Sequence, residues 1–223
     1  EAKNKYVRPI ITREYDHSWN MFDMHLYPGG AWRLHMLRQL VGDDKFWAGV
    51  QAYVNTYAAH TVKSLDFQRC IENHSGLNLD GFFDMWFRSK GYPILKVSFE
   101  YDKKKGQGKF TFEQSQVDDK KGIKLFELDI EVGWQDGKGA DYVEMVHLSK
   151  GTQIVNIKMD EPAHVILDPD MKALFEADFN PGDDKLRHLL EHGKTVRGLM
   201  QAMSELAKTG KRKNLQAIRD YLR

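Results

Sequence analysis

Tyr27 is the residue whose type and setting come nearest to chemistry in this chain. Pro28 disfavours helical dihedrals in the residue before it, and Gly29 and Gly30 allow a sharp turn ahead of the apolar helical pattern of residues 32–41. The phenol is therefore expected in a stiff loop before a helix end, where it could donate a hydrogen bond to a developing oxyanion. These residues leave open the alternative of a buried loop tyrosine with a satisfied hydroxyl.

His25 and Asp23 lie close to this tyrosine in the sequence. His25 stands two residues before Tyr27, and a solvated or core histidine is the simpler interpretation. Asp23 could orient a neighbour, but nothing in the sequence shows that it does. Residues 1 to about 20 are polar without a clear period, so we expect a tail there.

A second candidate is the segment from His188 to His192, which reads H-x-x-E-H, the inverted zinc motif. On a helix the two histidines would share a face and could hold one metal ion. Gly193 ends the helix on the second histidine, and only a short tail follows that could supply a third ligand. We therefore expect an amphipathic helix without metal, and zinc analysis with His188→Ala would test the alternative.

No other motif supplies a self-contained catalytic constellation. H-E-x-x-H, Walker-type, G-x-G-x-x-G and G-x-S-x-G patterns do not occur. The single cysteine, Cys70, excludes an intrachain disulfide and a cysteine-based zinc cluster. Because it lies on the apolar side of a helical pattern with Phe67 and Ile71, a buried inert thiol is expected.

Composition limits the class of protein. The chain has 223 residues, of which 41% are apolar and 29% charged, so two or three folded units are expected. A net charge of +1 argues against a nucleic-acid or polybasic membrane binder, and no apolar run is long enough to span a membrane. The low cysteine count favours a cytoplasmic location. Because the chain starts at Glu1 in the middle of a pattern, we expect a piece of a longer protein.

The hydrophobic period changes twice along the chain. It is helical up to Gly91, alternates with period two from Leu95 to about Leu167, and is helical again from Asp183. The first part predicts four helices. The apolar stripe of the second of these helices is expected in a core. The middle part predicts about six short antiparallel strands that form a sandwich, and the last part predicts stacked short helices. The predicted stripe is Phe46, Trp47, Val50, Tyr53, Val54 and Tyr57.

A family resemblance joins these observations. The chain resembles the gluzincin zinc aminopeptidases, the group of aminopeptidase N, the puromycin-sensitive enzyme and leukotriene hydrolase. The residues that carry the resemblance lie between Phe22 and Pro93. They are Tyr27-x-x-Gly30-Ala31, Met36-Leu37, Leu40-x-Gly42, Phe46, Tyr53, Asp66, Phe82-Phe83, Trp86 and Gly91-x-Pro93.

The resemblance implies a multidomain α+β protein. Residues 1–91 would be the helical end of a thermolysin-like catalytic domain, residues 92–180 an antiparallel β-sandwich, and residues 181–223 the start of a HEAT-like helical array. The family's zinc ligands and general base would lie upstream, so the chain alone is expected to hold no zinc and to be inactive. Its implied partners are a peptide substrate and the upstream catalytic region of the same protein, with no nucleic acid.

The resemblance gives Tyr27 one role, because it matches the tyrosine that hydrogen-bonds the oxyanion of the tetrahedral intermediate. The residue two positions later is usually lysine in the family and is Gly29 here. Substrate preference is therefore not transferred, and a non-catalytic aminopeptidase-like scaffold for protein interaction stays open as the alternative.

Overall fold

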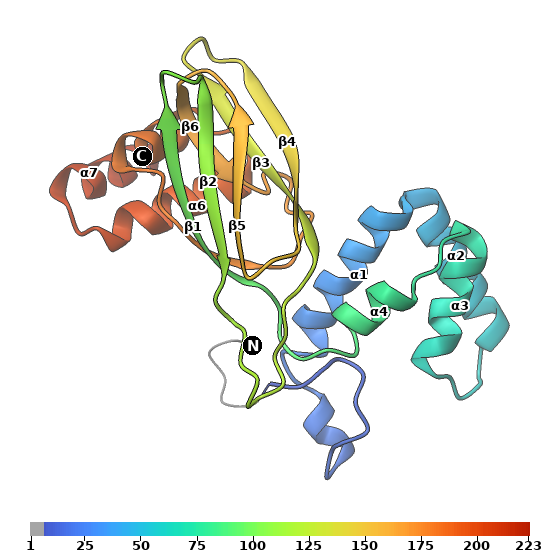
Figure 1. Ribbon diagram of the computed structural model, residues 1–223. Coiled ribbons are helices and arrows are strands. Elements are labelled where there is room, and N and C mark those ends of the chain that lie inside the picture. Colours follow the sequence, from blue (N-terminus) through green and yellow to red (C-terminus); the bar gives the residue numbers. More distant parts are fainter. Residues whose placement is uncertain (1–6) are drawn as a thin grey trace. The chain divides into compact units, whose positions relative to one another are not determined.

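The computed structural model describes residues 7–223, which form two compact units (Figure 1). The first comprises the residues up to Tyr92 together with Asp118–Lys124, and the second comprises Pro93–Val117 and Leu125–Arg223. Among the described residues, no helix combines the length and the apolar character needed to cross a membrane. Each unit is described separately.

The first unit is helical, and its helices follow one another with short connections. After a short 3-10 helix, α1 leads directly into α2 through Gly42, and α2 packs against α3. A glycine with positive φ, Gly76, ends α3. The elements are η1 (Ser18–Met21), α1 (Tyr27–Val41), α2 (Asp43–Tyr57), α3 (Ser64–Ser75) and α4 (Asp80–Trp86).

Large apolar side chains fill the core of this unit. Leu37 of α1, Ile71 of α3 and Phe83 of α4 are almost completely buried. The prediction that the whole apolar stripe of α2 is buried is wrong, because Trp47 is 55% exposed and Val54 is 57% exposed. These two residues lie two helical turns apart and so share one face, which lines an open groove bordered by α1, α2 and Phe67 of α3.

The second unit contains two β-sheets. One has the strand order β5-β2-β1-β7 and the other β4-β3-β6. All pairings are antiparallel except that between β1 and β7, which is parallel, so the prediction of a wholly antiparallel arrangement is wrong at this edge. With four residues, β7 is too short to show an alternating pattern. The strands are β1 (Ile94–Asp102), β2 (Gln107–Gln114), β3 (Leu128–Asp136), β4 (Asp141–Leu148), β5 (Thr152–Lys158), β6 (Pro162–Leu167) and β7 (Glu176–Phe179).

Three helices complete the second unit, namely α5 (Asp183–His192), α6 (Val196–Lys208) and α7 (Arg212–Tyr221). Thr195 caps α6 by accepting a hydrogen bond from the N–H of Gly198. Helices α5 and α6 pack on β6 around one apolar cluster. Its buried members are Ile166, Leu186, Leu189, Leu190, Ala202 and Leu206. The described chain is thus an α+β protein with two sheets and seven α-helices, and its division into three domains stays a prediction.

Candidate functional site

Tyr27 is the first residue of α1, and its side chain is 61% exposed. The prediction of a loop that runs up to residue 32 is therefore wrong. Proline is tolerated in the first helical turn, because the N–H that it lacks would have no helical partner there. The N–H of Gly30 already makes a helical bond of 3.1 Å to the carbonyl of Leu26, so Gly29 and Gly30 continue the helix.

The turn that enters α1 is organised by Asp23. One oxygen of its carboxylate, Oδ1, accepts hydrogen bonds from the N–H groups of His25 (2.9 Å) and Leu26 (3.0 Å). Its backbone carbonyl accepts the N–H of Tyr27 at 3.2 Å. Asp23 thus satisfies N–H groups that precede the regular helix, and this local hydrogen bonding outweighs the bias against helical dihedrals before proline.

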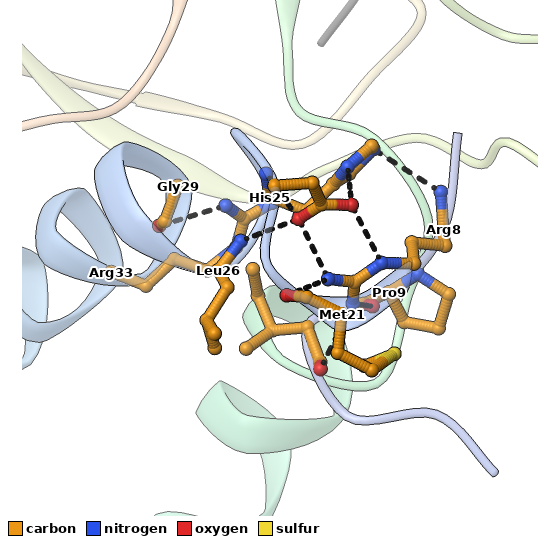
Figure 2. Close-up of polar contacts among 9 residues, drawn as sticks. Arg8, Pro9, Met21, His25, Leu26, Gly29 and Arg33 are labelled. Carbon is orange, nitrogen blue, oxygen red and sulfur yellow. Dashed lines mark hydrogen bonds and ion pairs between the residues drawn. The ribbon is translucent and has the colours of Figure 1, made fainter. Parts of the chain in front are cut away.

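Arg8 holds the carboxylate of Asp23 in place. Its Nε lies 3.0 Å from Oδ2 and its Nη2 lies 2.8 Å from Oδ1, which is a two-point contact between the guanidinium and the carboxylate. The same guanidinium donates to the carbonyl oxygens of Pro9, Ile10 and Met21 (Figure 2). Arg8 is only 3% exposed, so the prediction of a polar tail over residues 1 to about 20 is wrong at this position.

His25 completes this cluster and is almost fully buried. Its Nδ1 lies 3.0 Å from Oδ2 of Asp23, and its Nε2 faces the backbone N–H of Arg8 at 3.4 Å (Figure 2). Because a backbone N–H can only donate, Nε2 must be the acceptor and Nδ1 carries the hydrogen. The sequence left open whether Asp23 orients a neighbour, and the structure shows that it orients His25.

The charge of Asp23 is stabilised within this cluster. Burial by itself raises the pKa of the carboxyl group, but hydrogen bonds from the Arg8 guanidinium, the Leu26 N–H and His25 act in the opposite direction. The balance places the pKa of Asp23 below its ordinary value. Asp23 therefore remains an anion over the neutral pH range, as its pairing with Arg8 requires.

Arg33 ties the first turn of α1 to the end of α4. Its side chain is 1% exposed and donates to the carbonyl oxygens of Gly29 (2.9 Å), Gly91 (2.8 Å) and Trp86. Sequence reasoning missed this residue. Its position was a usable signal, since it lies four residues before Leu37 on the face of α1 that turns to the core.

One aromatic ring contacts the ring of Tyr27, and a second ring contacts the first. The ring of Phe22 lies 6.1 Å from that of Tyr27, and the ring of Trp19 lies 5.1 Å from that of Phe22. Phe22 and Trp19 are themselves more than half exposed. Within residues 7–223, no group forms a hydrogen bond with the Tyr27 hydroxyl, which leaves it available to a molecule from outside.

The H-x-x-E-H segment has a different arrangement from a zinc site. Nδ1 of His188 lies 3.0 Å from Nδ1 of His164, and Glu191 forms an exposed ion pair with His192. Burial and the neighbouring His188 lower the pKa of His164 to about 4. Across the described residues, no three histidine, cysteine, aspartate or glutamate side chains lie close enough to hold a metal ion, so these residues do not fit zinc.

Cys70 is buried, as predicted, and burial raises the pKa of its thiol. A buried thiol with a raised pKa carries little thiolate at neutral pH and is a poor nucleophile. Of the candidate residues that the sequence indicated, only Tyr27 is an exposed side chain next to the polar cluster of Arg8, Asp23 and His25.

Comparison with known proteins gives this geometry a family context. Residues 1–86 match the Peptidase family M1 domain. Aminopeptidase A of Gloydius brevicauda is 37% identical over 82 residues, which cover 37% of this chain and 9% of that protein. Glutamyl aminopeptidase of Mus musculus is 24% identical over 169 residues, which cover 73% of this chain and 17% of that protein.

A solved structure extends the similarity in fold beyond the matched domain. The crystal structure of Legionella pneumophila aminopeptidase A in complex with aspartic acid superposes with a TM-score of 0.71 at 18% sequence identity. The superposition covers 91% of this chain and 24% of that one, so the chain spans about a quarter of the length of its structural relative. Residues 1–86 thus match the M1 domain, and the resemblance of this chain to the gluzincin aminopeptidases is confirmed.

Proposed function

We propose that this chain is part of a zinc-dependent aminopeptidase that removes amino-terminal residues from peptides, and that Tyr27 is its contribution to the chemistry. The observation that carries the proposal is the place of Tyr27. It lies within the residues that match the M1 domain and begins α1 with an exposed phenol.

The setting of Tyr27 suits a donor to a developing negative charge. When a nucleophile attacks a peptide carbonyl, the carbonyl oxygen gains negative charge, and a phenol O–H can donate a hydrogen bond to it. Tyr27 stands at the amino-terminal end of a 15-residue helix, where the backbone dipoles also favour negative charge. No group among the described residues competes for this hydrogen bond.

The role of the chain is limited to this hydrogen bond. The M1 family is zinc-dependent, but residues 7–223 do not fit a zinc ion, so no step through the metal is assigned to them. The nucleophile and its general base would come from other residues of the same protein. On this proposal, residues 1–91 end the catalytic domain, residues 92–180 form the sandwich domain, and residues 181–223 begin a helical array.

An activity assay on the intact natural protein tests this proposal. We expect hydrolysis of aminoacyl-anilides with a free amino group and no hydrolysis of their N-acetylated forms. The 223-residue chain by itself should hydrolyse neither substrate. An intact, folded protein that binds peptides but cleaves none of them would contradict the proposal and support the non-catalytic scaffold, which the departure at Gly29 also motivates.

A further inference from the structure

Asp23 accepts two consecutive backbone N–H groups at the start of α1. Its carbonyl oxygen accepts the N–H of Tyr27 itself at 3.2 Å. Its carboxylate accepts the N–H of the preceding residue, Leu26, at 3.0 Å. The backbone that enters α1 at Leu26 and Tyr27 is therefore held by one residue.

The carboxylate of Asp23 is itself fixed by Arg8. The guanidinium is a rigid planar fork, and three backbone carbonyls hold it in addition to the two carboxylate oxygens. Oδ2 of Asp23 also lies 3.0 Å from Nδ1 of His25. Rotation of the carboxylate away from Leu26 would break the contacts with Arg8 and His25 together.

The phenol of Tyr27 depends on this backbone support. It is 61% exposed, and within the described part of the chain its hydroxyl has no hydrogen-bond partner that could fix it instead. The accuracy with which the hydroxyl reaches a reacting oxygen is then set by where the helix begins. Displacements of about 1 Å can lower a reaction rate by about 10²-fold.

We propose that Arg8 and Asp23 are positioning residues for Tyr27, with their partly buried ion pair fixing the start of α1 and hence the place of the phenol. This inference rests on the proposed function of Tyr27. It assigns a role to Arg8, which lies nineteen residues away from Tyr27 in the chain, and the role requires no contact of either residue with the substrate.

A double-mutant cycle in the intact protein tests the inference. Asp23→Ala should lower kcat about tenfold or more with little change in KM, because the substrate still binds while the donor is misplaced. In a Tyr27→Phe background the same substitution should change kcat less than about twofold, since its effect acts through the phenol. Amide hydrogen exchange at Leu26 and Tyr27 should speed up in Asp23→Ala.

Two further variants keep the test decisive if Asp23→Ala folds poorly. Asp23→Asn retains an oxygen for the Leu26 N–H but loses the charge that pairs with Arg8, so its loss in kcat should be smaller. Asp66→Ala is the matched control, because the carboxylate of Asp66 likewise accepts a backbone N–H at the start of a helix, that of Lys63 at 2.7 Å before α3. This substitution should leave kcat unchanged.

The outcomes separate the two ideas. A normal kcat in Tyr27→Phe would contradict the proposed function. A large loss in Tyr27→Phe combined with a normal kcat in both Asp23 variants would overturn the positioning role alone. Losses that multiply in the double variant would also overturn it, because Asp23 would then act independently of the phenol.

Discussion

The guanidinium of Arg33 donates a hydrogen bond of 2.8 Å to the carbonyl oxygen of Gly91. The two residues lie fifty-eight positions apart, and the same side chain also reaches the carbonyls of Gly29 and Trp86. One buried arginine therefore links the first turn of α1, where Tyr27 lies, to the end of α4. Its charge is stabilised by carbonyl dipoles on three segments.

Removal of this arginine should destabilise the first unit strongly. Arg33→Leu leaves buried carbonyl groups without their donor, and we expect the free energy of unfolding to fall by about 3 kcal/mol or more. Chemical denaturation monitored by circular dichroism measures this change. Arg38→Leu, which removes an exposed ion pair with Asp43, is the control and should have a small effect. Equal effects of the two substitutions would contradict the assigned role of Arg33.

A close approach between α2 and α3 makes Gly49 sensitive to substitution. A Cβ atom there would lie 2.7 Å from Cδ1 of Ile71, 3.1 Å from its Cα and 3.2 Å from the carbonyl oxygen of Cys70. Because two of these atoms belong to the backbone, Gly49→Ala should cost about 1–3 kcal/mol of stability.

Gly81 in α4 is the matched control for Gly49. A Cβ atom at Gly81 meets nothing within 4 Å, so Gly81→Ala should be neutral or stabilising by up to about 1 kcal/mol. Thermal unfolding of both variants measures the contrast. A tolerated Gly49→Ala would mean that the two helices lie farther apart than described.

Acid should destabilise the second unit through His164. Burial first, and then the neighbouring His188, lower the pKa of His164 to about 4, while Asp141 acts in the opposite direction and His192 and Lys194 add to the lowering. An unfolded histidine has a pKa of about 6.5, so between these values the unfolded state binds more protons. The stability due to a neutral His164 is complete above about pH 6.5 and is lost as the pH falls toward 4.

Unfolding measured from pH 7.5 to pH 4 checks this expectation. The slope due to His164 should reach at most about 1.4 kcal/mol per pH unit and should disappear in His164→Gln. His147→Gln is the control for the loss of an exposed histidine, since His147 forms an exposed pair with Asp129, and the slope due to His164 should persist in this variant. A profile that is the same with and without His164 would contradict the described burial of this ring.

The exposed face of α2 should tolerate polar side chains. Trp47→Gln should change stability by less than about 0.5 kcal/mol, because the side chain is more than half exposed. Phe46→Ala should cost about 3–5 kcal/mol, because the adjacent side chain is 6% exposed and belongs to the core. Denaturant titrations of the two variants provide the comparison. A large loss for Trp47→Gln would show that its ring is buried.

The sequence predicted the helices and strands better than it predicted which elements pack against one another. Hydrophobic period located the helices up to Gly91, most of the strands and the final helices, because period reports which face of an element avoids water. It could not show that Trp47 and Val54 face a groove, since an apolar stripe looks the same whether or not a partner covers it. The hydrophobic period also did not reveal β7, because this short strand pairs with β1, which is distant in the sequence, over only four residues.

The polar network around Tyr27 was largely invisible in the sequence. Arg8 and Asp23 lie fifteen residues apart and meet only because the chain folds back, so no spacing rule connects them. The prediction of a loop at Tyr27 relied on Pro28, which disfavours helical dihedrals in the residue before it. In the structure, hydrogen bonds from the backbone N–H groups of residues 25–27 to Asp23 outweigh this bias. Tyr27 itself was found through the family resemblance and the pattern downstream of it.

The most direct test of the account is the turnover of a Tyr27→Phe variant of the intact protein. The substitution removes one oxygen from an exposed side chain, and the Phe22 ring contact can remain. If Tyr27 donates the hydrogen bond to the oxyanion, kcat/KM for aminoacyl-anilides should fall about 10²–10³-fold. Zinc content should stay unchanged, and Tyr57→Phe should behave as the unmodified protein does. Normal turnover in Tyr27→Phe would contradict the account.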